Sequence, residues 1–349
     1  MKPIKLLQLA KSRLLLLLCL VLVVVISAIV YRTAGPRRAK TAAGKMIPAV
    51  KTSTGWQAPD SNSIPITREG ELIRYGKRLI ANTAFYLGPR GIVAPISNGM
   101  NCQNCHLDAG TRFYGNNYSA VFSTYPRFRE RSGSVEDIYK RVNDCFERSL
   151  NGKSLDTAGR EMQAIAAYIK WLGQNVPHNI KPAGAGIRDI PFQPGAADTA
   201  KGNIIYSQKC MRCHGSGGEG VLNADSSLYV YPPLWGAHSY TVSAGLYRIS
   251  RFAGFVRDNM PFGASHDAPQ LTDEEAWNIA AFINSQPRPG KRFKKDWPDI
   301  SGKPVDYPFG PYADSFPERQ HKYGPFEPIR LAKQQAQERN KKQGPITKH

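Results

Sequence analysis

Acidic residues, cysteines and long apolar runs are all scarce in this chain of 349 residues. There are 27 Asp and Glu against 47 Lys and Arg, so the formal net charge is +20, which argues against a basic partner. The excess of positive charge points instead to an anionic substrate, an acidic redox partner, a membrane surface or nucleic acid. A single long apolar run, residues 14–30, leaves about 300 residues for two compact domains and a long extension.

Four of the six cysteines fall in two copies of the motif Cys-x-x-Cys-His, at residues 102–106 and 210–214. In c-type haem attachment the two thiols form thioethers with the haem vinyl groups, and the histidine is the proximal iron ligand. Two Cys-x-x-Cys pairs could also hold one structural zinc ion, but these pairs lie 108 positions apart and each is followed directly by His. We therefore predict two covalently attached haem c groups. The attachment residues are Cys102, Cys105, Cys210 and Cys213, and the proximal ligands are His106 and His214.

Basic residues flank the apolar run 14–30 on both sides. Its length of about 17 residues exceeds a usual signal-peptide core and is at the lower limit for a membrane span. We predict that residues 1–34 are an uncleaved membrane anchor, with a cleaved signal peptide as the alternative, and that residues 35–59 are a spacer. Because c-type haem is attached outside the cytoplasm, the bulk of the chain is expected in the periplasm or at the outer face of the inner membrane, without a nucleic-acid partner. Cys19, inside the run, is interpreted as a small hydrophobic residue.

The first domain, residues 60–180, is predicted to begin and end with an amphipathic helix. The opening helix has these residues at helical spacing: Leu72, Ile73, Gly76, Leu79, Ile80 and Thr83. The closing helix is expected to begin near Thr157, with Asp156 or Thr157 as its cap, and to end at Gly173. Its buried face is predicted to carry Met162, Ile165, Ala166, Ile169 and Leu172.

The second domain, residues 196–290, repeats this plan in shorter form. An opening helix with Gly202 and Tyr206 runs into the second haem motif, and a closing helix begins at Thr272, an N-cap with Glu275 three residues on. The predicted buried side of the closing helix carries Ala276, Trp277, Ile279, Ala280 and Ile283. This repeated order predicts an all-α fold of two cytochrome c-type haem domains in tandem.

The remaining segments differ in composition. Residues 181–195 are rich in Pro and Gly, which predicts a linker. In residues 291–349, aromatic residues from Trp297 to Phe326 are spaced among Pro and Gly. Such a segment cannot form its own core, so we expect a long irregular extension that wraps over both domains. From about Leu331 it is rich in Lys, Gln and Arg, which predicts a basic tail that is either a solvated helix or disordered.

The residue opposite each proximal histidine decides whether a haem passes electrons or carries out chemistry. For the second haem the candidate is Met260, 46 residues after His214 and directly before a proline that holds it off a regular helix. A thioether ligand raises the haem potential and suits an electron-exit site. His238 and His266 are alternatives, although each is more often a surface histidine.

For the first haem the candidate ligand is a cysteine. Met162 falls on a predicted core face, and Met100 is too close to Cys102 to reach the opposite side. Cys145, 39 residues after His106, is the odd cysteine once the others are assigned. It is either a thiolate ligand, which would lower the potential and be a sulfur nucleophile, or a buried inert thiol.

Cationic and hydroxyl side chains lie near Cys145 in the sequence: Arg131, Arg141, Arg148, Ser149 and Lys153. Guanidinium groups bind oxyanions with paired hydrogen bonds, although a charged helix face in water would have a similar composition. Arg141, Cys145 and Ser149 stand at i, i+4 and i+8, on one side of a helix. That spacing favours a site over scattered surface charge.

Three stretches resemble one known family: residues 143–153, 303–312 and 320–326. With the two haem motifs they are similar to the dihaem thiosulfate dehydrogenases, whose members also reduce tetrathionate, over nearly the whole exported chain. The resemblance implies that two thiosulfate ions are oxidised to tetrathionate at a haem ligated by His106 and Cys145, through a thiosulfonate adduct on the cysteine. It makes Arg131, Arg141, Ser149 and Lys153 candidates for holding the sulfonate end of thiosulfate.

The family resemblance also implies that electrons leave through the second haem to a c-type cytochrome or another periplasmic acceptor. Some relatives have Lys directly before the methionine and exchange the two as ligands with redox state. Asn259 stands there in this chain and is a poor iron ligand, so we predict constant ligation by His214 and Met260.

Two other functions use the same haem motifs. A membrane-tethered dihaem electron carrier without its own substrate would not need the arginines around Cys145. A thiolate-haem enzyme that joins thiosulfate to a carrier-protein cysteine would need them, but the matching C-terminal extension argues against it.

Overall fold

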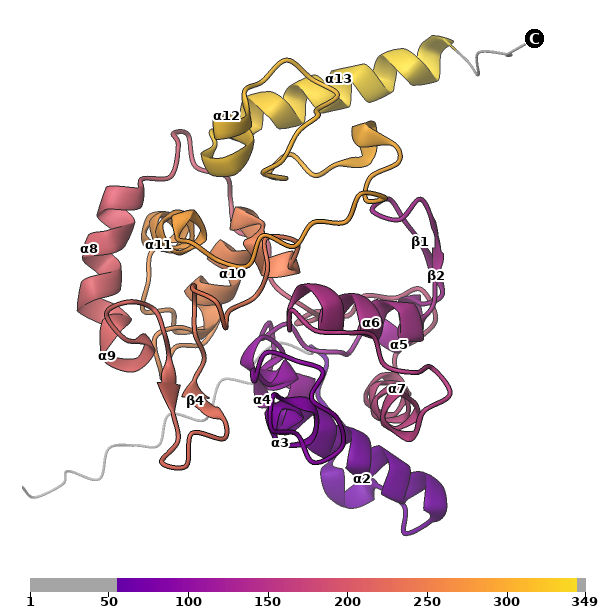
Figure 1. The fold of residues 1–349 in the computed structure, drawn as a ribbon. Helices are drawn as coiled ribbons and strands as arrows, with labels where there is room; N and C mark the ends of the chain where they lie inside the picture. The colour runs from indigo at the N-terminus through magenta and orange to yellow at the C-terminus, as the bar shows by residue number, and fades with distance from the viewer. Residues whose placement is uncertain (1–54, 344–349) are drawn as a thin grey trace, which may run out of the picture. The chain divides into compact units, whose positions relative to one another are not determined.

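The computed structural model describes residues 55–343, in which the chain is mostly helical (Figure 1). The first domain contains α2 (Arg68–Ala81), α3 (Thr83–Leu87), α4 (Leu107–Gly110), α5 (Val121–Thr124), α6 (Ile138–Arg148) and α7 (Arg160–Gly173). The second contains α8 (Thr199–Lys209), α9 (Met211–His214), α10 (Ile249–Asn259) and α11 (Asp273–Ser285), and the extension contains α12 (Glu318–Tyr323) and α13 (Glu327–Gln343). Two antiparallel hairpins pair β1 (Arg127–Arg129) with β2 (Ser134–Glu136) and β3 (Val221–Leu222) with β4 (Tyr229–Tyr231). The predicted all-α class is confirmed.

Each domain is built on one crossing pair of helices, α2 with α7 and α8 with α11. A glycine lets the two backbones approach closely at each crossing. A Cβ atom added at Gly76 would lie 2.0 Å from the carbonyl oxygen of Ala164, and one added at Gly202 would lie 2.0 Å from that of Asn278. The equivalent glycines confirm the internal repeat.

The helices bury most of the faces that their sequence periodicity predicts. Leu72 and Ala166 are only partly buried, and Thr83 lies in α3, after the opening helix has ended at Ala81. Gly202 and Tyr206 are buried in α8, which runs into Cys210 as expected. The N-terminus of α11 has the predicted capping box, because Thr272 Oγ1 accepts from the Glu275 amide at 3.1 Å and the Glu275 carboxylate accepts from the Thr272 amide at 2.8 Å. Buried residues on the predicted faces of α2 and α11 are Ile73, Gly76, Leu79, Ile80, Ala276, Trp277, Ile279, Ala280 and Ile283.

The start of α7 differs from the prediction. Its N-cap is Gly159, so neither Asp156 nor Thr157 caps this helix. The Asp156 carboxylate instead accepts from the Ala158 amide at 3.1 Å, and the Thr157 carbonyl accepts from the Gln163 side chain at 2.6 Å. Both residues are thus used in a turn that precedes the helix. The helix ends at Gly173 as predicted, with Met162, Ile165, Ile169 and Leu172 buried.

The Pro- and Gly-rich segment between the domains is irregular but packed. Its Gly184 and Gly186 carbonyls accept hydrogen bonds from the amides of Tyr114 and Asn116 at 2.8 and 2.9 Å. Further along, Arg188 forms two hydrogen bonds with the buried Asp258 carboxylate, at 2.7 and 2.9 Å. The segment therefore ties the loop after the first haem motif to the end of α10.

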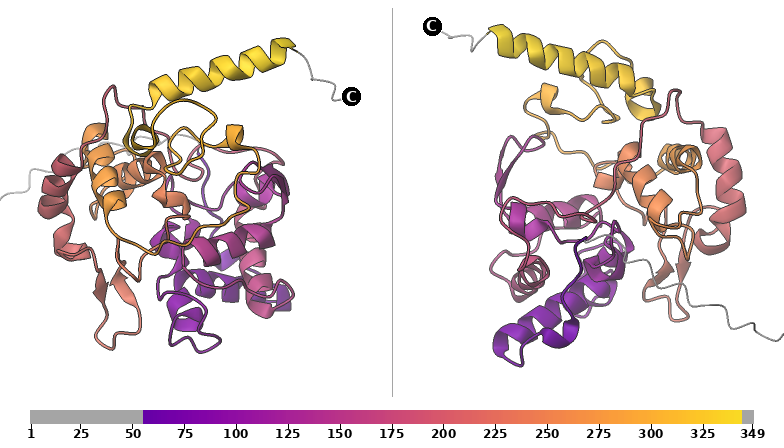
Figure 2. Two further views of the ribbon diagram at one scale, coloured as in Figure 1. Left: turned by 45° about the horizontal axis from the view of Figure 1, so that its top comes forward. Right: turned by 180° about the vertical axis from the view of Figure 1, so that it is seen from behind.

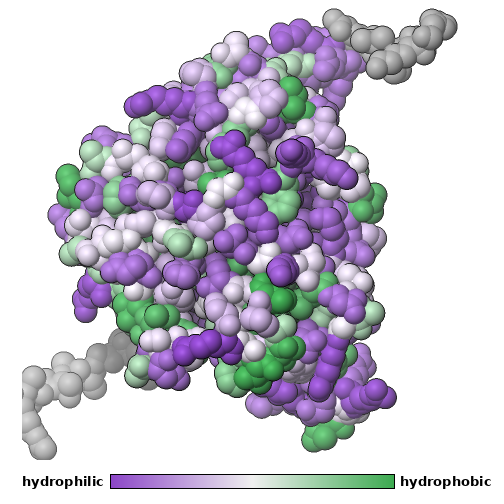
Figure 3. Space-filling model, viewed as in Figure 1, coloured by the Kyte–Doolittle hydropathy of each residue, from purple (hydrophilic) through white to green (hydrophobic). Residues whose placement is uncertain are grey.

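The extension lies against both domains (Figures 1 and 2). The Trp297 amide donates to the Arg131 carbonyl of the first domain at 2.7 Å, and Phe326 is buried in the core of the second domain. Asp306 accepts hydrogen bonds from Arg248 at 2.5 and 2.8 Å. The basic tail forms α13. The surface around this helix in Figure 3 is mostly hydrophilic, as expected if the tail is a solvated helix.

In the part of the chain that the structure describes, no helix is both long and apolar enough to cross a membrane. The predicted anchor, with its apolar run 14–30, and the predicted spacer up to residue 54 lie outside the described residues.

Candidate active site

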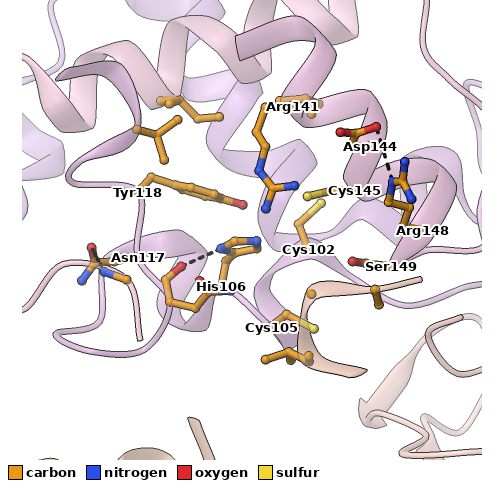
Figure 4. Close-up of a pocket in the computed structure, with 18 of the residues that line it drawn as sticks. Cys102, Cys105, His106, Asn117, Tyr118, Arg141, Asp144, Cys145, Arg148 and Ser149 are labelled. Carbon is orange, nitrogen blue, oxygen red and sulfur yellow. Dashed lines mark hydrogen bonds and ion pairs between the residues drawn. The ribbon is translucent and has the colours of Figure 1, made fainter. Parts of the chain in front are cut away.

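The first haem motif opens onto a cavity of about 480 Å³, which is within the size range of cofactor pockets (Figure 4). Cys102, Cys105 and His106 line it from the motif, and Cys145 lines it from α6. Residues of the second domain, among them Leu246, complete the wall. A haem attached to the two thiols would therefore lie in a space that both domains enclose.

The motif is tied to α3 by two buried polar side chains, one from the helix and one from the residue before Cys102. The Thr83 hydroxyl accepts from the Cys102 amide at 3.0 Å, and the Asn101 side chain accepts from the Ala84 amide at 2.8 Å. Burial raises the pKa of both Cys102 and Cys105 to about 12, so the free thiols are neutral. Both thiols line the cavity, where a haem attached to them would lie.

His106 has one ring nitrogen engaged and one free. Its Nδ1 lies 2.6 Å from the carbonyl oxygen of Asn116, which can only accept, so Nδ1 carries the proton and Nε2 keeps a lone pair. Burial lowers the pKa of His106 to about 4, so the ring is neutral at neutral pH. The Tyr118 ring stacks on the imidazole with 4.5 Å between centroids. A neutral imidazole with a free Nε2 lone pair is the state that an iron ligand requires.

Helix α6 brings the predicted sulfur and cation together. Arg141, Cys145 and Ser149 all line the cavity, as their spacing predicted (Figure 4). The helix begins where the Asp137 carboxylate accepts from the Lys140 amide at 2.7 Å, which satisfies one of the free amides of the first turn. The pKa of Arg141 is raised, chiefly because a negative charge on the Cys145 sulfur would lie beside its guanidinium. The arrangement can hold an anion next to a sulfur nucleophile.

The other two predicted substrate residues have different positions. Arg131 lines the cavity and is partly buried, and within residues 55–343 its buried Nε atom has no hydrogen-bond partner. Burial, followed by the charges of Arg148 and Arg141, lowers the pKa of Arg131 to about 10. Lys153 is exposed and is not among the residues that line the cavity. The structure thus brings Arg131, but not Lys153, to Cys145.

Sequence reasoning left several lining cations out of the proposed site. They are Arg127, Arg129, Arg148, Lys181, Arg248 and Arg251. Four of them have carboxylate partners, with Arg129 near Glu136, Arg148 on Asp144 and Asp296, Arg248 on Asp306, and Arg251 on Asp189. No local sequence signal could have found the lining residues of the second domain, because the approach of α10 to the first haem motif is a tertiary contact.

The second motif repeats the histidine geometry. His214 Nδ1 lies 2.9 Å from the carbonyl oxygen of Pro232, and burial lowers its pKa, so its Nε2 is also free for iron. Cys210 ends α8 and Cys213 lies in α9. Met260 follows the last residue of α10 and packs, partly buried, against the second core.

The alternative ligands to Met260 are placed elsewhere. His238 is exposed. His266 lies 2.9 Å from Asp267, and its ring contacts Phe113 of the first domain with 4.6 Å between centroids. Asn259 is buried, and its amide donates to the Phe255 carbonyl at 2.9 Å and to the Tyr114 carbonyl at 3.2 Å. Both donor hydrogens of Asn259 are therefore used within the protein.

Comparisons with known proteins match both haem domains. Residues 94–177 match the family model described as SoxA/TsdA, cytochrome c domain, and residues 199–287 match the cytochrome c model. A thiosulfate dehydrogenase of Psychrobacter arcticus is 37% identical over 262 residues, which is 74% of each chain. One of Allochromatium vinosum is 35% identical over 235 residues, which is 66% of this chain and 83% of the relative.

A solved structure also resembles this one. The thiosulfate dehydrogenase of Marichromatium purpuratum superposes with a TM-score of 0.63 at 32% identity, covering 68% of this chain and 51% of that longer one. With a haem-attachment motif in each of its two cytochrome c domains, the chain belongs to the family of dihaem thiosulfate dehydrogenases, and its cofactors are two c-type haems.

Proposed function

We propose that this protein oxidises two thiosulfate ions to one tetrathionate ion and passes two electrons to the haems. The observation that carries the proposal is the meeting of Cys145 and Arg141 in the cavity that the first haem motif lines. The haems, when bound, supply the electron acceptors and carry electrons away. His106 and Cys145 would ligate the first haem, and His214 and Met260 the second.

Cys145 would be the group that bonds to substrate. Its thiolate and the terminal sulfur of one thiosulfate form an S–S bond with the release of two electrons, which gives a thiosulfonate group on the cysteine. The terminal sulfur of a second thiosulfate then attacks the outer sulfur of that S–S bond. Tetrathionate leaves and the Cys145 thiolate is regenerated, so atoms and charge balance and no proton is consumed.

Arg131 and Arg141 would bring the anions together. Two dianions repel each other, and fixed buried charges offset that repulsion without reorganising during the reaction. Arg141 lies beside Cys145, and Arg131 enters from the loop between β1 and β2 with an uncommitted Nε atom. The Ser149 hydroxyl, one turn beyond Cys145 on the same side of α6, could donate to a sulfonate oxygen.

Electrons would leave through the second haem to a c-type cytochrome or another periplasmic acceptor. Constant ligation by His214 and Met260 is supported by Asn259, whose amide is held by two main-chain carbonyls. Residues 14–30 would anchor the protein at the outer face of the inner membrane.

The test is to mix the oxidised holoprotein with thiosulfate and an artificial electron acceptor and to measure reduced acceptor and tetrathionate together. One tetrathionate per two electrons is the expected result. The proposal is contradicted if a preparation with intact haems forms no tetrathionate and if tetrathionate does not reoxidise its reduced haems. The remaining functions would then be an electron carrier or an enzyme that acts on a carrier protein.

A further inference from the structure

Arg148 lines the cavity, but its guanidinium is already paired with carboxylates. Its Nη1 and Nη2 atoms donate to the two carboxylate oxygens of Asp296 at 2.6 and 2.8 Å, and its Nε atom lies 3.5 Å from Asp144. The guanidinium also lies over the Phe293 ring, 3.8 Å from its centroid. Burial by itself would lower the pKa of Arg148, but the hydrogen bonds and charge of Asp296, together with Asp144, outweigh it and raise the pKa.

The neighbouring arginines have no such partner. Among residues 55–343, neither Arg131 nor Arg141 lies within ion-pair distance of a carboxylate. The Arg131 guanidinium makes one long contact, 3.4 Å from Nη1 to the Ser243 carbonyl oxygen, and lies 5.6 Å from the Trp297 ring centre. Arg127 and Lys181 also line the cavity but are exposed. Among the less exposed lining cations of residues 55–343, Arg131 and Arg141 lack a carboxylate partner, whereas Arg148 is neutralised.

The neutralising group comes from the extension. Residues 293–297 supply Phe293 under Arg148, Asp296 on Arg148 and Trp297 beside Arg131. The Arg148 and Asp296 side chains are 7% and 11% exposed, so solvent screens their interaction little. A segment about 150 positions beyond Cys145 therefore neutralises one arginine of the cavity wall.

We propose that Asp296 is a positioning residue that withholds Arg148 from the substrate, so that the anion binds to Arg131 and Arg141 beside Cys145 and not to Arg148. The proposal rests on the function proposed above and specifies its anion site. A third free cation would tighten the binding of thiosulfate and of the tetrathionate dianion alike. Uniform tightening of this kind lowers KM without raising kcat, and it slows product release.

The test measures the affinity of the oxidised holoprotein for inorganic sulfate, an inert dianion, by calorimetric titration. Asp296→Asn keeps the shape of the side chain but removes its charge, so Arg148 becomes available to the cavity. We expect sulfate to bind about tenfold more tightly, the size of one hydrogen bond to a charged group, and the KM for thiosulfate to fall with no rise in kcat. Asp299→Asn removes the same charge from an exposed position of the extension and is expected to leave sulfate affinity unchanged.

The double variant Arg148→Gln/Asp296→Asn decides between withholding and direct binding. If Arg148 is withheld, replacing the pair with two neutral amides keeps sulfate affinity within about twofold of the wild type. If Arg148 itself binds the anion, the double variant loses about tenfold or more, and the proposal is overturned. Weaker or unchanged sulfate binding by folded Asp296→Asn would overturn it too. Where that single variant fails to fold, the double variant still gives the answer.

Failure of this inference and failure of the proposed function are distinguishable. Tetrathionate formation by the wild-type protein tests the function and does not depend on Asp296. Wild-type turnover with a double variant that loses sulfate affinity would reject the role of Asp296 alone.

Discussion

The two haem domains share one scaffold and differ in what lies between the motif and the closing helix. Each has a helix pair crossing at a glycine and a histidine whose Nδ1 faces a main-chain carbonyl. In the first domain, the intervening segment presents Cys145 and the unpaired Arg141 from α6, and Arg131 from the β1–β2 loop, to a cavity. In the second, it contains α10, where Asp258 pairs with Arg257 and with Arg188 of the linker, and Arg248 at the start of the helix pairs with Asp306.

Under the proposed function, that difference would separate chemistry from electron transfer. Charge that is already paired is unavailable to a substrate, whereas an unpaired, partly buried cation can still bind an anion. The shared scaffold would then position each haem, and the segment after each motif would determine what that haem does.

The largest effect is expected from Cys145→Ala. The variant has no sulfur to bond with thiosulfate and no thiolate for the first haem, so thiosulfate oxidation should be lost almost completely. Electron passage through the second haem should continue, which can be measured as oxidation of dithionite-reduced protein by an artificial acceptor. Substantial tetrathionate formation by this variant would mean that the two domains do not differ in the way proposed.

Arg141→Gln should reduce kcat/KM for thiosulfate by about a hundredfold, the usual effect of removing one charged donor that stabilises a reacting anion. The control is Lys153→Gln, which removes the same charge from an exposed residue off the cavity. That control is expected to change kcat/KM by less than about threefold. Equal losses in the two variants would show that overall charge, and not the cavity, attracts the substrate.

Met260→Ala addresses the second domain. Loss of a thioether ligand should lower the midpoint potential of the second haem on the order of 100 mV and slow the exit of electrons. Met211→Ala is a matched control, because Met211 lies inside the second haem motif but is exposed. A redox titration in which the two variants coincide would remove Met260 as the ligand.

Periodicity and motif spacing predicted much of this molecule. The paired helices, the capping box of α11, the two haem motifs and the common face of Arg141, Cys145 and Ser149 all depend on residues close in sequence, where geometry is set locally. The predicted start of α7 was wrong because Asp156 and Thr157, the expected caps, form a turn before the helix. The partner of Arg148 was not predictable, because Asp296 reaches it from the extension, and the exclusion of Lys153 depends on a loop conformation.

The smallest effect on function, and a direct test of the shared scaffold, is expected from alanine at the crossing glycines. Gly76→Ala and Gly202→Ala each place a methyl group against a main-chain carbonyl that cannot move alone, so each should lower the free energy of unfolding by about 1–3 kcal/mol. Gly195→Ala and Gly290→Ala are controls, because an added Cβ meets no atom within 4 Å there. Denaturant unfolding of the holoproteins measures all four. If Gly76→Ala is destabilised and Gly202→Ala is not, then α8 and α11 can move apart to accept the methyl group, whereas α2 and α7 cannot. The two crossings would then share their geometry but differ in rigidity.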